Sequence, residues 1–452
     1  MPGGRDPRHR RRAVSGESGV SRPTVEREDR DIGLQAALVQ PALNGSWGVP
    51  PSRMTRISSF AEVDEVFKSK DFAQAGNGHG DGAVIYGKTL ISLSGDDHFE
   101  RRRVESVLFR KESLLRYETE ILEVALTLAL DECVAGRDAD GVVRADLVTL
   151  LPSVILRVSS NLVGLDGLDD RARFDRLRSL VPKLGEGAAA QYTFRDHAEV
   201  IREAREARDI FVSEFFRPAW ERRAAMIAAS ARGELAGSEI PVDLITIMIR
   251  NPGHFTKWDD EVYANEAILY IVASSGNPTS RAMDAMANLQ DWLHEHPEDL
   301  ARVEDPEFLR LALTESLRLK MGVPFQVRRA VRDTVLTSSG RAFSEGDYVA
   351  LEHGFASRDA ELFGADADRY DLRRTPPSFG FAFGGGPHTC NGKGMSIGEP
   401  NARGDAPLGL LVRIIGRLFA AGLRLDPARP PRLRPDTIRN EWSSFPVLLE
   451  KL

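Results

Sequence analysis

Apolar residues recur every three or four positions from about residue 96 to 200, as in the segment ILEVALTLALDECV. This spacing places them along one side of an α-helix, so the region predicts a succession of helices. The segments 243–249, 259–293 and 408–421 follow the same pattern, whereas residues 331–350 have the turn signals of a small β region. No internal repeat or low-complexity linker divides the chain. The pattern therefore predicts one large, mainly α domain with minor β structure.

Composition excludes several functional classes. The chain has 452 residues and a net charge of −7, which argues against a nucleic-acid partner. Its two cysteines, Cys133 and Cys390, can form neither a disulfide framework nor a cysteine-rich zinc site, so a reducing, cytoplasmic location fits best. The most apolar run, 408–423, is interrupted by Arg413 and Arg417, and no membrane span is expected.

The N-terminal segment is basic at first and then mixed in charge, with no apolar stretch behind its arginines. It therefore fits neither a signal peptide nor a membrane anchor. We predict that residues 1–32 form a disordered basic tail and that residues 33–452 form the single domain. A basic docking arm is the alternative interpretation of the tail.

The segment FAFGGGPHTCNGKG, residues 381–394, surrounds Cys390 with glycines. A thiolate that binds iron is tuned by backbone N–H groups directed at its sulfur. A tight loop that directs several amides inward needs residues that tolerate a positive φ, and the glycines at 384–386 and Gly392 do so. Phe383 could shield the sulfur from water. A glycine-rich turn around a buried cysteine would have the same composition.

This segment resembles the cytochrome P450 signature F-x-x-G-x-x-x-C-x-G, with matches at Phe383, Gly386, Cys390 and Gly392. The resemblance implies the cytochrome P450 fold, haem b as cofactor and Cys390 as the axial iron ligand. It also implies that His388 is a partner of a haem propionate. Cys133, in an apolar helical stretch, is interpreted as a core residue.

Further motifs follow the order found in the same family. LALTESLR resembles the K helix, with Glu315 and Arg318 paired three positions apart on one helix face. Arg328 begins an R-x-A-x-x-D strand and is implied to bind a propionate through its planar guanidinium. His98 and Arg102, four apart on the segment that resembles the C helix, would reach the other propionate. The resemblance extends over about residues 50–450.

The distal helix departs from the family. Its usual A-G-x-(D/E)-T-(T/S) pattern aligns through Gly276 and Thr279, which places Pro278 at the acidic position. In the family this acid and the threonine relay protons to dioxygen, and proline cannot do so. Thr279 and Asn277, which could hold a water molecule, are the catalytic candidates. We expect the helix to kink at Pro278, with Thr279 facing the haem.

A second departure follows the cysteine. PNARGDAP, residues 400–407, separates the start of a helix after Cys390 from the apolar pattern that resumes at Leu408. Its prolines and glycine predict a broken helix or a loop insertion. Electron donors dock on this side in the family, so the usual mode of docking is in doubt.

The resemblance implies a monooxygenase-type oxidoreductase that inserts oxygen from dioxygen into a small organic substrate, in secondary metabolism. Its electrons would come from a separate ferredoxin with its reductase, or a similar donor, because the chain shows no flavin or iron–sulfur domain. One alternative is an atypical family member that uses peroxide, or that isomerises, dehydrates or cross-links its substrate. Another is a haem-binding sensor or scaffold, which would not need Thr279.

Overall fold

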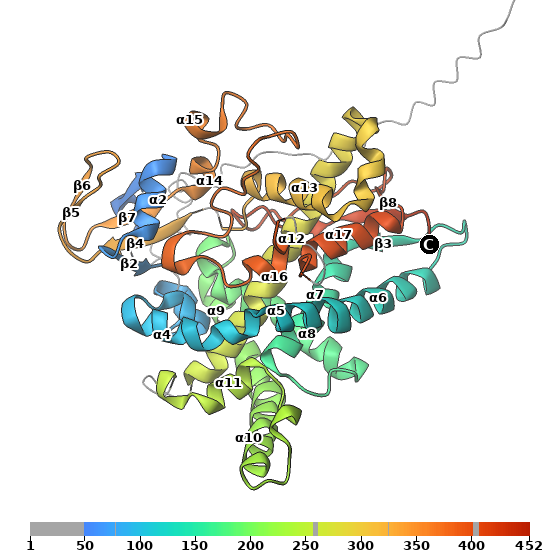
Figure 1. The fold of residues 1–452 in the computed structure, drawn as a ribbon, viewed down its shortest axis with the longest axis horizontal. Coiled ribbons are helices and arrows are strands. Elements are labelled where there is room, and N and C mark those ends of the chain that lie inside the picture. Colours follow the sequence, from blue (N-terminus) through green and yellow to red (C-terminus); the bar gives the residue numbers. More distant parts are fainter. Residues whose placement is uncertain (1–48, 77, 256–260, 324, 401–405) are drawn as a thin grey trace, which may run out of the picture.

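The computed structural model describes residues 49–76, 78–255, 261–323, 325–400 and 406–452. Within them the predicted architecture is confirmed: the fold is mainly α-helical, with a small sheet at one side (Figure 1). The predicted tail, residues 1–32, lies outside the described residues. Among the described helices, none combines the length and the apolar character that a bilayer-crossing segment needs.

The helices follow the predicted apolar periodicity. They are α2 (Phe60–Lys68), α3 (Ala83–Tyr86), α4 (Gly95–Glu105), α5 (Lys111–Arg116), α6 (Glu123–Ala135), α7 (Leu147–Val163), α8 (Arg171–Ala188), α9 (His197–Phe211), α10 (Arg217–Ala231), α11 (Leu244–Arg250), α12 (Glu261–Glu295), α13 (Pro306–Leu319), α14 (His353–Ala356), α15 (Ala360–Phe363), α16 (Lys393–Ile397) and α17 (Leu410–Ala420). Aspartates start six of the described helices by accepting a bond from a backbone N–H of the first turn, an N-cap that satisfies an otherwise unpaired donor. These caps are Asp146, Asp170, Asp196, Asp243, Asp305 and Asp359.

The main sheet has four strands in the order β1-β7-β4-β2. They are β1 (Met54–Ile57), β2 (Phe72–Ala75), β4 (Gln326–Ala330) and β7 (Tyr348–Leu351). β1 runs parallel to β7 and the other pairs are antiparallel, with Gln74 opposite Arg328. The smaller sheets contain β3 (Arg144–Asp146), β5 (Thr334–Val335), β6 (Ala342–Phe343), β8 (Leu423–Leu425), β9 (Arg432–Leu433), β10 (Trp442–Ser444) and β11 (Pro446–Leu449).

Helix α12 crosses the middle of the molecule (Figure 1) and packs against α7, α8 and α13. It is buried along most of its length and continues through Pro278. Proline has no N–H, so the helix lacks the bond that residue 278 would otherwise donate to the Ser274 carbonyl. The predicted kink at Pro278 stays a prediction.

The predicted break after the cysteine segment is confirmed, because α16 ends at Ile397 and α17 begins at Leu410. The two ends of the intervening segment meet: a Cβ placed on Gly409 would lie 2.4 Å from the carbonyl carbon of Ile397. The buried Glu118 carboxylate holds the returning end, since it accepts bonds from the Leu408 and Gly409 N–H groups at 3.1 and 2.7 Å. The chain thus leaves and re-enters the core at one point.

Candidate active site

A cavity of about 320 Å³ lies between α4, α12, the main sheet and the loop that carries Cys390. The predicted residues His98, Arg102, Phe383, His388 and Cys390 all line it, as do Gly392 and Asn277. The structure therefore gathers residues that are far apart in the sequence, from His98 to Gly392, around a single space. Cys390 has solvent-accessible surface because its thiol faces this space.

The cysteine loop is held by its backbone. The N–H of Cys390 donates to the Phe383 carbonyl at 2.9 Å, which closes the loop, and α16 begins three residues after the cysteine. Gly386 has φ +60°, and a Cβ there would lie 1.9 Å from the backbone oxygen of Phe67 on α2. A residue with a side chain cannot meet both conditions, so glycine is required at this position.

The surroundings of Cys390 shift the pKa of its thiol in opposite directions. Burial raises the pKa of the Cys390 thiol, whereas the Gly392 N–H, the Arg102 charge and the Lys393 N–H lower it. The amides directed at the sulfur are the donors that a metal-bound thiolate requires. Burial has the larger effect, so the pKa of the Cys390 thiol lies above its usual value.

Two histidines meet at the cavity wall. The rings of His98 and His388 lie 3.9 Å apart between centroids. Burial lowers the pKa of His98 to about 4 and that of His388 to about 3, so both are neutral at pH 7. Arg102 lies beside them and donates from Nη2 to the Thr389 carbonyl at 2.6 Å.

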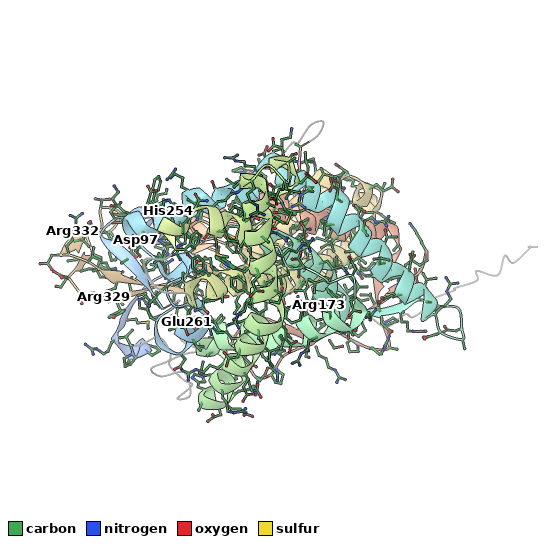
Figure 2. The ribbon with its side chains drawn as sticks, turned by 90° about the horizontal axis from the view of Figure 1, so that it is seen from below. Asp97, Arg173, His254, Glu261, Arg329 and Arg332 are labelled. Carbon is green, nitrogen blue, oxygen red and sulfur yellow. The ribbon has the colours of Figure 1, made fainter. Side chains whose placement is uncertain are left out.

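Arg328 lies behind the cavity wall. Its guanidinium donates to the side-chain oxygens of Gln74 at 2.6 Å and Gln326 at 3.0 Å, and these two glutamines line the cavity. The arginine is 3% exposed, and burial lowers its pKa to about 10. Among the described residues its partners are neutral, and a buried cation normally needs an anionic one. Its neighbour Arg329 is exposed at the sheet end of the molecule (Figure 2).

His353 lines the same cavity and was not predicted from the sequence. It is buried, its Nδ1 lies 3.0 Å from the Leu351 carbonyl oxygen, and burial lowers its pKa to about 4. No sequence signal marked it, because it is a single histidine at the start of a short helix, outside any motif.

Glu315 and Arg318 form the predicted pair on α13. Arg318 donates from Nε and Nη2 to the Glu315 carboxylate at 2.9 and 2.8 Å, and from Nη1 to the carbonyls of Ser357 and Ala367. Arg374 donates to the same carboxylate at 3.1 Å. The network joins α13 to residues 357–374, and it lies away from the cavity lining.

The distal helix presents Asn277 and Pro278 to the Cys390 cavity, and Thr279 to a different one. The Thr279 hydroxyl donates to the carbonyls of Ser275 and Gly276, at 2.8 and 2.9 Å. Thr279 thus lines the second cavity and not the Cys390 cavity, and the expectation that it faces the haem stays a prediction. Each residue turns a helix by about 100°, so Thr279 points well away from Asn277.

The second cavity has a volume of about 580 Å³ and lies between α7, α8, α12 and residues 434–443. Its lining includes apolar side chains of the three helices, such as Val148, Val181 and Met283, and ion-paired side chains such as Arg434 and Asp436. Asn277 is the one residue, in the part of the chain that the structure describes, that lines both cavities.

These residues fit haem b. Its iron takes a thiolate ligand, and its two propionates need cationic or donor groups. The Cys390 cavity has one thiol with amides directed at it, and Arg102, His98 and His388 line its wall. The buried Arg328, whose described partners are neutral, adds a positive charge that an anion in the cavity would balance.

Comparison with known proteins identifies the family. The cytochrome P450 family model matches residues 286–400, which include Glu315, Arg328 and Cys390. The chain is 27% identical over 387 residues to the C-19 steroid 1alpha-hydroxylase of Sorangium cellulosum, covering 81% of this chain and 83% of that protein. It is 31% identical over 159 residues to the luteothin monooxygenase of Streptomyces thioluteus, covering 34% and 37%.

Solved structures show the same fold. The crystal structure of CalO2 superposes with a TM-score of 0.65 and 22% identity, covering 88% of this chain and 92% of that one. That of epothilone D-bound P450epoK gives a TM-score of 0.65 with 19% identity, covering 88% and 91%. Together with the cysteine loop and its cavity, these comparisons show that the chain belongs to the cytochrome P450 family and is a haem b oxidoreductase.

Proposed function

We propose that Cys390 is the axial ligand of the haem iron. The observation that carries this proposal is the position of its thiol, which opens into the cavity while the Gly392 and Lys393 amides point at the sulfur. Phe383, which packs edge-on against Phe379 with centroids 5.3 Å apart, lines the cavity beside it and limits the access of water. Cys133 lies on α6, far from Cys390 in the sequence, and lines neither cavity described above.

We propose that His98, Arg102, Arg328 and His388 hold the haem carboxylates. Arg102 and the two histidines line the cavity directly, while Arg328 acts from behind Gln74 and Gln326. A carboxylate close to either histidine would stabilise its protonated form and raise its pKa. Glu315 and Arg318 hold residues 357–374 against α13 and act on the site only through this packing.

When bound, haem b activates dioxygen for the oxidation of a small organic substrate. We propose hydroxylation of an apolar natural product that enters through the second cavity, whose apolar side chains can pack against such a substrate. Relatives named as a steroid hydroxylase and a luteothin monooxygenase support this choice. Asn277 lines the Cys390 cavity, and Thr279 lies behind it on the same helix. We propose these two as the polar catalytic residues of α12.

We further propose a cytoplasmic location and a separate ferredoxin, with its reductase, as the electron donor. Two free cysteines, one of which must stay reduced to bind iron, fit a reducing compartment. The donor is tested by following NADH consumption with a ferredoxin and, in parallel, with a flavodoxin. Faster turnover with the flavodoxin would contradict the ferredoxin assignment.

The reduced carbon monoxide difference spectrum tests the axial ligand. The wild type and Cys133→Ser should show a band near 450 nm, the mark of a thiolate ligand, whereas Cys390→Ser should not. A band that persists in Cys390→Ser and disappears in Cys133→Ser would overturn the assignment. Product analysis with a panel of steroids and polyketides then tests the substrate class.

A further inference from the structure

Asn277 stands at the boundary between the two cavities. It lines the Cys390 cavity together with Ser274 and Pro278, and it lines the second cavity together with Gly276 and Thr279. Any molecule that extends from the second cavity toward Cys390 therefore passes its carboxamide. The orientation of this carboxamide decides whether such a molecule meets a hydrogen-bond donor or an acceptor.

Arg439 determines that orientation. It lies 162 residues further along the chain and donates from Nη2 to the Asn277 Oδ1. Its Nε donates to the Gly322 carbonyl at 3.0 Å, and its Nη1 lies 3.1 Å from the Glu441 carboxylate. All three guanidinium nitrogens thus have partners, so the arginine is held in place and acts as a clamp.

Gly322 supports the carboxamide from another side. A Cβ at position 322 would lie 2.6 Å from the Asn277 Oδ1 and 2.8 Å from its Cγ. A real Cβ atom does not approach another heavy atom this closely, so Asn277 can occupy its place only because residue 322 has no side chain. Two independent contacts, from Arg439 and from Gly322, therefore fix the same amide.

The bond from Arg439 determines which end of the Asn277 amide faces the cavities. A guanidinium only donates hydrogen bonds, so the atom of Asn277 that faces Arg439 must be the oxygen. The amide NH₂ consequently points the other way, and among the described residues no acceptor takes a hydrogen bond from it. A donor without a partner at a cavity wall is completed by an acceptor from the bound molecule.

We propose that the Asn277 NH₂ group recognises an oxygen acceptor on the substrate, such as a carbonyl, ether or hydroxyl oxygen, and that Arg439 and Gly322 are positioning residues for it. The inference rests on the proposed function, because it assigns a substrate class to the same site. Cationic amines are disfavoured, since the group that Asn277 offers is a donor and the Arg439 charge lies beside it.

Isothermal titration calorimetry of the haem-loaded enzyme with trans-2-decalone and trans-2-decalol tests the proposal. The ketone only accepts hydrogen bonds, whereas the alcohol also donates. Asn277→Asp keeps the shape and the bond to Arg439 but replaces the NH₂ donor with an acceptor. It should weaken decalone binding about tenfold and leave decalol within about threefold.

The positioning residues have their own readout, the ratio of the decalone to the decalol dissociation constant. Arg439→Gln frees the carboxamide to turn and should weaken decalone binding about threefold, and Arg439→Lys, which again only donates, should restore it. Gly322→Ala should shift the ratio in the same direction as Arg439→Gln. A role in folding alone would change both dissociation constants equally.

Decalone binding by Asn277→Asp as tight as that of the wild type would overturn the proposal, and so would a wild type that binds no decalone. The 450 nm band separates these results from a failure of the proposed function. A wild type without the band refutes the axial ligand, whereas a wild type with the band and an unaltered Asn277→Asp refutes only the present inference.

Discussion

The two sides of the Cys390 cavity are built on different principles. On the cysteine side, residues 383–392 are held by backbone contacts: a closing N–H···O bond at Cys390 and a close approach to α2 at Gly386. On the opposite side, α12 is a continuous helix. The polar groups that it presents to the cavity depend on which side chains project from it. There Asn277 and Pro278 face the cavity, and Thr279 turns away.

The difference shows which parts of such a site can vary. A loop held by its backbone tolerates almost no substitution, because its glycines provide the space and the φ angles that it needs. A helix wall can exchange one polar group for another without any change in its backbone. Here that freedom corresponds to a proline at the family's acidic position and an asparagine held by Arg439.

A matched pair of glycines gives the largest expected effect. Gly386→Ala should destabilise the haem-loaded enzyme by at least about 3 kcal/mol and remove most of the 450 nm band, because φ is positive and a Cβ would overlap Phe67. Gly276→Ala, in α12, meets no atom within 4 Å and should stabilise by about 0.5–1 kcal/mol. Urea unfolding and the carbon monoxide spectrum measure both. Equal effects at the two positions would break the comparison.

Neighbouring arginines on β4 give the next effect. Arg328→Ala should weaken haem retention by about 1.5–3 kcal/mol, the contribution of a charge-assisted hydrogen bond. Arg329→Ala is the control, since this side chain is exposed on the other face of the strand. Haem transfer to apomyoglobin measures retention. Loss of haem from Arg329→Ala at the rate of Arg328→Ala would assign the effect to the strand and not to the buried charge.

Stability below pH 6.5 depends on His353. Its pKa is about 4 in the folded protein because it is buried, and about 6.5 when unfolded. Between these values the unfolded chain binds a proton that the folded chain does not, so stability falls as pH decreases. The loss is about 1.4 kcal/mol per pH unit from this residue. His353→Gln should flatten the curve measured by urea unfolding at pH 7.0, 6.0 and 5.0. An unchanged slope would show that His353 is protonated when folded.

Replacement of Thr279 should have the smallest effect. Its hydroxyl bonds to carbonyls of its own helix and faces the second cavity, so Thr279→Ala should change product formed per NADH by less than about twofold. Pro278→Asp, which places a carboxyl group on the side facing Cys390, is the companion variant and should change the same ratio more. A severe loss of coupling in Thr279→Ala would show that the threonine reaches the haem side.

Sequence reasoning predicted the cysteine side well because its signals are local. The glycines around Cys390, the spacing of Glu315 and Arg318, and the break after Ile397 are each confined to a few positions. The cytochrome P450 fold and haem b were predicted from them and are confirmed.

The distal side could not be predicted in the same way. The contact between Asn277 and Arg439 joins residues 162 positions apart, and Arg439 lies in no recognisable motif. His353 lines the cavity only because β7 ends beside it. The direction of Thr279 depends on the rotation of α12 against α7 and α8, which packing determines and a residue pattern does not.

The backbone at Gly398 contacts the backbone at Gly409, so the segment that connects α16 to α17 begins and ends at the same place in the fold. Since the two ends of this segment are in contact, its length is independent of the distance between α16 and α17. Doubling such a loop costs only about 0.6 kcal/mol in closure entropy. This position, shortly after Cys390, is thus a natural site for domain insertion, where an electron-transfer module could be fused into the chain while Glu118 holds the start of α17 in place.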